Sequence, residues 1–164
     1  MHNVPLFSSF NIKSKTLRNR IVLSPMCQYK AKDGKISELH LQHYSRFAFS
    51  GLGAAFIEAT GVSPEGRIGH GCTGIWSDDH IDGLSKIAKV FKEYNCVSGI
   101  QLAHAGRKAS FLRPWDGASP ITKDDTIEPA WKTIGPSAIP INEKSPVPKE
   151  MTLDDINKVR NEFK

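Results

Sequence analysis

The sequence has few of the features that mark a disulfide-linked, metal-bound or membrane-spanning protein. Its three cysteines, Cys27, Cys72 and Cys96, are odd in number and have no CxxC spacing, which indicates neither a disulfide framework nor a zinc site. No apolar run approaches the roughly 20 residues that a membrane helix needs. The first ten residues lack the charged-then-apolar pattern of a signal peptide. We therefore expect a cytoplasmic protein in a reducing compartment.

Signatures of phosphate and nucleic-acid binding are also missing. The glycine-containing segment 63–71, SPEGRIGHG, has neither GxGxxG nor GxxxxGK[ST] spacing, so neither a Rossmann fingerprint nor a P-loop is present. The formal net charge is +5, but the basic residues of the first 35 positions stand singly among apolar residues. Nucleic-acid-binding proteins cluster such charge and interleave it with stacking aromatics. We therefore expect a small-molecule substrate, and neither a nucleic acid nor a membrane as partner.

Three continuous apolar runs are the main feature that is present. They lie at about 21–24, 53–59 and 97–103. None shows the in–out alternation of a half-exposed strand, which indicates strands that are buried on both faces. Each run is followed by a segment with helical spacing, so the order is βαβαβα. This order predicts an α/β fold in which helices cover a parallel sheet.

The helical segments carry recognisable start signals. The first follows Ser37 and has an apolar stripe that includes Tyr44. The second is expected to begin at Asp79 as its N-cap. The third begins at Thr152, with Asp155 in the capping-box position, which predicts a helix from 153 onward.

Two other segments and the end of the chain bear on domain organisation. Residues 10–19 fit a small hairpin, and residues 104–150 form a long stretch rich in Pro and Gly without periodicity. A loop of this length in a compact domain is usually a lid or a binding loop. Three βα units cannot close a barrel, so we expect the sequence to be the front part of a longer protein.

Polar and unusual side chains gather where the three predicted strands end. In parallel α/β folds this edge of the sheet faces the ligand. The strand ends deliver, in chain order, Ser24, Pro25, Met26 and Cys27, then Glu58, Ala59 and Thr60, and then Gln101 and His104. The Gln101 amide can both donate and accept, which suits the edge of a planar heterocycle such as the pyrimidine ring of a flavin. Hydrogen bonds to neighbouring backbone are an equally good explanation from the pattern alone.

Several of the remaining candidates have simpler explanations. Met26 and Cys27 are common gap-fillers in a core, and no nearby base marks Cys27 as a nucleophile. Tyr29 is either a packed aromatic with its hydroxyl at the surface or a donor to a substrate oxygen. His40 and His43 have a spacing that can bind a metal, but the sequence offers no third ligand. We therefore favour a place on a helix face and expect no metal site.

Four stretches, taken together, are more specific than any single motif. They are RNRIVLSPMCQY, HYSRFAFSGLGAAFIEATGVSPEGR, GIWSDDHIDGL and GIQLAHAGRKA, in this order. From about Leu6 onward the chain closely resembles the old yellow enzyme family of FMN-dependent ene-reductases, in its thermophilic-like branch. The resemblance implies an FMN-binding (β/α)8 TIM barrel, of which residues 1–164 would be the N-terminal portion with the first three βα units. It also implies reduction by NADPH or NADH and hydride transfer to activated alkenes such as α,β-unsaturated carbonyls.

The resemblance also implies roles for individual residues. Tyr29 would contact the substrate, and Cys27 would tune the reduction potential of the flavin. The implied cofactor-binding residues are Ser24, Pro25, Met26, Cys27, Ala59 and Gln101. The paired histidines and the proton-donating tyrosine of the family, and its segments for the FMN phosphate, have no counterpart in these 164 residues. No catalytic residue is therefore expected within this chain.

The missing parts leave alternatives open. One is a truncated, catalytically silent fragment, or a split-gene half that needs a complementary C-terminal chain. A homo-oligomer is also compatible with the sequence. A third alternative is a different flavin-dependent barrel enzyme, one that reduces tRNA. The dispersed basic charge and the motifs SPMCQY and IQLAHAGR argue against it.

Overall fold

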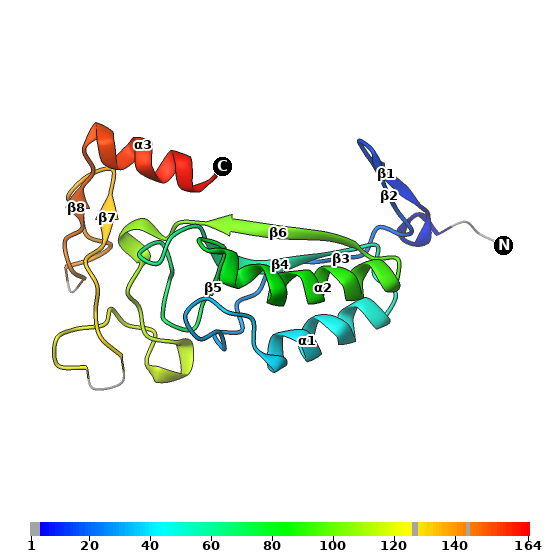
Figure 1. Cartoon of the computed structure of the whole chain (residues 1–164), viewed down its shortest axis with the longest axis horizontal. Helices are drawn as coiled ribbons and strands as arrows, with labels where there is room; N and C mark the ends of the chain where they lie inside the picture. Colours follow the sequence, from blue (N-terminus) through cyan, green and yellow to red (C-terminus); the bar gives the residue numbers. More distant parts are fainter. Residues whose placement is uncertain (1–3, 126–127, 144) are drawn as a thin grey trace.

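A parallel sheet with two helices on one face forms the centre of the computed structural model (Figure 1), which describes residues 4–125, 128–143 and 145–164. The strands are β1 (Phe10–Ile12), β2 (Lys15–Leu17), β3 (Val22–Leu23), β4 (Ala54–Gly61), β5 (Thr73–Gly74), β6 (Val97–Ala103), β7 (Ile134–Gly135) and β8 (Lys149–Glu150). The α-helices are α1 (Glu38–Phe49), α2 (Ile81–Glu93) and α3 (Leu153–Glu162). Single 3-10 turns lie at Pro5–Phe7, Asp78–His80, Gly106–Lys108 and Pro114–Asp116.

Strand β4 is the central strand of the sheet. It pairs in parallel with β3 at its start, with β5 at its end, and with β6 along its whole length. The three predicted strands and their parallel arrangement are confirmed, although the first is shortened to β3. The two-residue strand β5 was not predicted, because its pairing depends on the end of β4 rather than on its own sequence.

The helix starts show which of the predicted caps form. At α3 the Thr152 Oγ1 accepts from the Asp155 N–H at 3.2 Å, and Asp155 Oδ2 accepts from the Thr152 N–H at 2.9 Å, so the predicted capping box is confirmed. The predicted N-cap at Asp79 is wrong. A 3-10 turn precedes α2, and Ser77 Oγ caps it by accepting from the Asp79 N–H.

The apolar core lies between the sheet and the two helices α1 and α2. Its buried members are Leu23, Tyr44, Ala48, Ala55, Ile57, Ile87, Phe91 and Cys96. Phe91 is completely buried, and its ring meets that of Tyr44 edge-on with the centroids 5.9 Å apart. This core fixes the distance between α1 and β4, which sets the geometry of the site described below.

The prediction that all three strands are buried on both faces is wrong for β3, where Val22 is 44% exposed, and for β6. The β6 residues Ser98, Gln101 and Leu102 are exposed, and Phe56 of the neighbouring strand β4 is 40% exposed. The helices α1 and α2 cover one face of the sheet, and no described element covers the other as completely. The apolar composition of these strands is therefore typical of a sheet that is covered on both faces.

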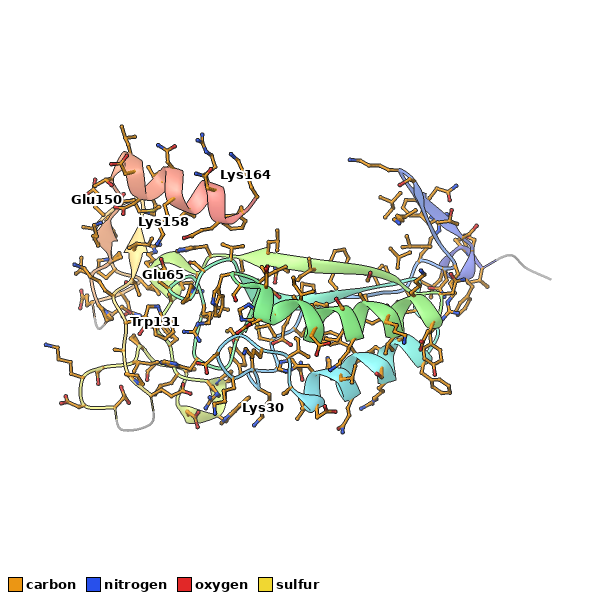
Figure 2. All side chains as sticks on the ribbon, in the orientation of Figure 1. Lys30, Glu65, Trp131, Glu150, Lys158 and Lys164 are labelled. Carbon is orange, nitrogen blue, oxygen red and sulfur yellow. The ribbon has the colours of Figure 1, made fainter. Side chains whose placement is uncertain are left out.

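The remaining segments lie at the two ends of the sheet (Figure 1). The predicted hairpin is confirmed as the antiparallel pair β1–β2. The long segment 104–150 lies at the opposite end and contains short elements, of which β7 pairs in parallel with β8. Helix α3 is held near this end by Lys158, whose Nζ donates to Glu65 Oε1 at 2.6 Å (Figure 2).

Candidate ligand-binding rim of the sheet

Ala59 and Gln101 lie side by side at the carboxyl end of the sheet. They are register partners in the parallel pair β4–β6, so their side chains emerge on the same face. A β-bulge between Ile57 and Ala59 sets this register. The bulge inserts one extra residue, Glu58, opposite Ile100 and thereby changes the face on which the following residues emerge.

Cys27 lies against this pair of strands. The backbone N–H of Ala59 hydrogen-bonds the Cys27 sulfur. The Cys27 thiol also interacts with the thiol of Cys72, which is buried next to β5. This thiol–thiol interaction and then burial raise the pKa of Cys27 well above its ordinary range. Cys27 is therefore a protonated thiol at neutral pH, which excludes the role of a ready nucleophile.

Tyr29 occupies an unusual backbone conformation beside Cys27. Its φ of 53° lies in the left-handed region, which is uncommon for a residue other than glycine. The conformation is held by the neighbouring segment, because the Ala31 N–H donates to the Gly71 carbonyl at 2.9 Å. Any Cβ on Gly71 would overlap the carbonyl oxygen of Tyr29, so only glycine permits this close approach.

The Tyr29 hydroxyl is turned toward the same cluster. Burial, followed by the effect of Cys27, raises the pKa of Tyr29 to about 12. Its ring meets that of Trp115 edge-on with centroids 6.0 Å apart. The Lys30 ammonium lies 4.8 Å from the centre of the same indole. The long segment 104–150 therefore reaches the predicted substrate-contacting tyrosine.

The predicted cofactor-binding residues differ in their exposure. Ser24, Met26 and Gln101 are exposed, whereas Pro25, Cys27 and Ala59 are partly buried. In the part of the chain that the structure describes, the Gln101 side chain makes no hydrogen bond to backbone. Apolar and sulfur-containing surface beside a free amide fits a flat heterocycle that has hydrogen-bonding groups along one edge.

Two buried residues support this surface: Cys72, which the sequence did not indicate, and Glu58, which the sequence placed at the ligand-facing edge but which the structure buries against α1. Cys72 follows no recognisable motif and meets Cys27 only through the fold. Glu58 has no exposed surface, and its Oε1 accepts from the Gln28 N–H at 3.0 Å. A charged residue within an otherwise apolar strand was the one available signal, because such a group requires buried partners.

The histidine pair of α1 has structural contacts. His40 is buried and its Nδ1 accepts from the Ser37 N–H at 3.1 Å, while His43 packs edge-on against Tyr44 and Phe47. Within residues 4–125, 128–143 and 145–164, no three His, Cys, Asp or Glu side chains are grouped so as to hold a metal ion. None of the helices described is long and apolar enough to cross a membrane.

The fold is one part of a parallel α/β barrel, and the candidate residues gather at the carboxyl ends of its strands. The sequence matches the model of the NADH:flavin oxidoreductase / NADH oxidase family over residues 5–164. The chain belongs to this family, which confirms the resemblance noted in the sequence.

Relatives and solved structures agree with this assignment. The NADPH dehydrogenase of Geobacillus thermodenitrificans is 45% identical over 163 residues, which cover 98% of this chain and 43% of that protein. The NADPH dehydrogenase of Bacillus licheniformis is 43% identical over 166 residues, which cover 100% of this chain and 44% of that protein. The old yellow enzyme from Trypanosoma cruzi superposes with a TM-score of 0.77 at 26% identity, covering 97% of this chain and 45% of that one. The chain thus spans less than half the length of these relatives, and its strands form a part of the old yellow enzyme barrel.

Proposed function

We propose that the full-length protein is an FMN-dependent NAD(P)H oxidoreductase that reduces activated alkenes such as α,β-unsaturated carbonyls. Residues 1–164 form the N-terminal portion of its single FMN-binding TIM-barrel domain. The observation that carries the proposal is the pairing of Ala59 with Gln101 beside the Cys27 thiol. Membership in a flavin oxidoreductase family supports the same assignment.

The rim residues have distinct roles in this proposal. Pro25, Met26 and Ala59 offer apolar surface to the flavin ring, and the Ser24 hydroxyl lies at its border. The Gln101 amide donates to and accepts from the pyrimidine edge. Cys27 presents a neutral thiol whose hydrogen bonding influences the reduction potential.

Substrate reduction uses groups from inside and outside this chain. Bound FMN would supply two-electron chemistry between NADPH or NADH and the β-carbon of the alkene. Tyr29 holds the substrate through its hydroxyl, whose pKa burial raises to about 12. The residues that polarise the carbonyl and protonate the product lie outside residues 1–164.

A product assay with the full-length protein tests the proposal. The purified protein is incubated anaerobically with NADPH, or with NADH, and a cyclic enone, and the products are separated by chromatography. We expect the saturated ketone, formed in proportion to the nicotinamide oxidised. Nicotinamide oxidation without saturated product, or a purified protein without FMN, would contradict the proposal.

The alternative is that the 164-residue chain is a catalytically silent fragment, or a half that pairs with a complementary C-terminal chain. It is supported by the exposed apolar side chains of the sheet, among them Phe56 of the central strand β4 and Leu102 of β6. The visible spectrum of the purified 164-residue chain separates the two ideas. A yellow protein that NADPH bleaches under anaerobic conditions would argue against silence, whereas a colourless, aggregating product would support it.

A further inference from the structure

The bulge in β4 gives Glu58 a position that a regular strand would not allow. Ile57 pairs with Ile100 and Ala59 pairs with Gln101, so Glu58 is the extra residue between them. Ile57 belongs to the apolar core beside α1 and α2, and Glu58 contacts α1 as well. Consecutive residues thus both enter the helix-covered side of the sheet, where Glu58 is fully buried.

Both oxygens of the Glu58 carboxylate accept hydrogen bonds. Oε1 accepts from the Gln28 backbone N–H at 3.0 Å, and Oε2 accepts from the Tyr44 hydroxyl at 3.1 Å. The same hydroxyl accepts from the Glu58 backbone N–H at 2.8 Å. These are the contacts of an ionised carboxylate, which has acceptors only.

His40 adds a third group on the same side. Its Nδ1 accepts from the Ser37 N–H, so in the neutral ring the proton lies on Nε2. This Nε2 is buried and lies 3.6 Å from Glu58 Oε1, and it has no hydrogen-bond partner among the described residues. Both side chains are fully buried. The Glu58 carboxylate thus contacts α1 through Tyr44 and the flavin-facing segment through Gln28.

We propose that Glu58 is a positioning residue of the flavin site: its buried carboxylate fixes the segment Met26–Gln28 against α1 and places a negative charge behind Cys27. The inference rests on the proposed function, because it concerns the same flavin-facing segment. The Gln28 N–H follows Cys27 directly in the chain, so its hydrogen bond to Glu58 determines where the Cys27 side chain lies. A buried charge without this geometry would be strongly unfavourable, which explains the number of donors around it.

The charge acts on the groups that face the ligand. The nearby carboxylate raises the pKa of Cys27, after the larger effects of Cys72 and burial. It contributes in the same direction to Tyr29, where burial is the main cause. A negative charge in the wall of a flavin site also opposes the addition of electrons to the ring, since buried charges interact through a low effective dielectric.

Two substitutions in the full-length holoprotein separate the charge from the position. Glu58→Gln removes the charge and keeps the length, whereas Glu58→Asp keeps the charge and withdraws it by one methylene. Glu93→Gln is the matched control, because it makes the same chemical change at an exposed residue of α2. The measurements are the flavin midpoint potential, by anaerobic dye titration, and the FMN dissociation constant, from the release of fluorescent FMN on dilution.

We expect Glu58→Gln to shift the potential to more positive values, with Glu93→Gln unchanged. Glu58→Asp should shift the potential less but weaken FMN binding about tenfold, because it loses a hydrogen bond to the flavin-facing backbone. The inference would be overturned if both Glu58 variants had the same midpoint potential and the same FMN dissociation constant as Glu93→Gln. In that case FMN binding, and so the proposed function, would still stand. A wild-type protein that binds no FMN would instead overturn the proposed function.

If the Glu58 variants fail to fold, Tyr44→Phe decides the question. This variant removes one donor to Oε2 and keeps the charge. We expect weaker FMN binding without a positive shift of the potential. FMN binding equal to that of wild type would show that the flavin-facing segment does not depend on the anchored carboxylate.

Discussion

The substitution Tyr44→Phe tests the buried network beneath the rim through protein stability. Tyr44 is 1% exposed, and its hydroxyl is the partner of both the Glu58 carboxylate and the Glu58 backbone N–H. Removal of the hydroxyl leaves two buried polar groups without their partner. Each such group costs about 1–3 kcal/mol, so the free energy of unfolding should fall by about 3 kcal/mol. The aromatic packing against Phe91 is retained, so this loss reflects hydrogen bonding alone.

The assay is urea unfolding of the full-length protein, followed by circular dichroism and tryptophan fluorescence, with coincident transitions as the test of two-state behaviour. Tyr94→Phe is the matched control, because Tyr94 is 42% exposed and surface changes of this kind stay within about 0.5 kcal/mol. A loss in Tyr44→Phe no larger than that in Tyr94→Phe would refute the network. It would mean that the Glu58 carboxylate finds other partners at no cost.

Three further predictions concern the frame and the site. Gly53→Ala should lower the yield of soluble protein, because its Cβ would overlap the Asn19 carbonyl oxygen; a yield equal to wild type contradicts this. The pKa of Asp155 is lowered to about 2, first by Lys149 and then by Thr152, so its stabilising effect is complete above its ordinary pKa of 3.8 and is lost as the pH falls toward 2. Thr152→Ala should therefore raise this pKa in an NMR titration, and an unchanged pKa would refute the cap. Cys27→Ala should shift the flavin potential without abolishing FMN binding, and an unchanged potential would remove its role as tuner.

Strands β3, β4 and β6 were predictable because each lies in a continuous apolar run. The signals are local: a parallel strand buried between layers needs apolar side chains at successive positions. The cap at Thr152 was predictable for the same reason, since both members of its capping box lie within one turn. The predicted N-cap of the second helical segment was wrong because Ser77 and Asp79 are both residues that cap helices well. In the structure Ser77 caps the 3-10 turn that precedes α2.

The supporting contacts of the site were not predictable from local sequence. The position of Glu58 depends on a bulge that exists only against its partner strand β6. Cys72 reaches Cys27 only because the segment at Gly71 is hydrogen-bonded to the segment at Ala31. In both cases the interaction joins residues that are distant in sequence, and its chemistry appears only after the chain has folded.

The central claim is that the surface around Ala59 is a wall of the flavin site, and FMN binding by an Ala59→Leu variant tests it most directly. The added side chain would occupy space beside Gln101 that the account assigns to the flavin ring. Ala88→Leu, at an exposed residue of α2, is the control, and circular dichroism of both variants verifies the fold. We predict that Ala59→Leu weakens FMN binding by about 100-fold, while Ala88→Leu binds FMN like wild type, since overpacking at a filled site typically costs about 1–3 kcal/mol. An Ala59→Leu protein that is folded and binds FMN as tightly as wild type would contradict the account.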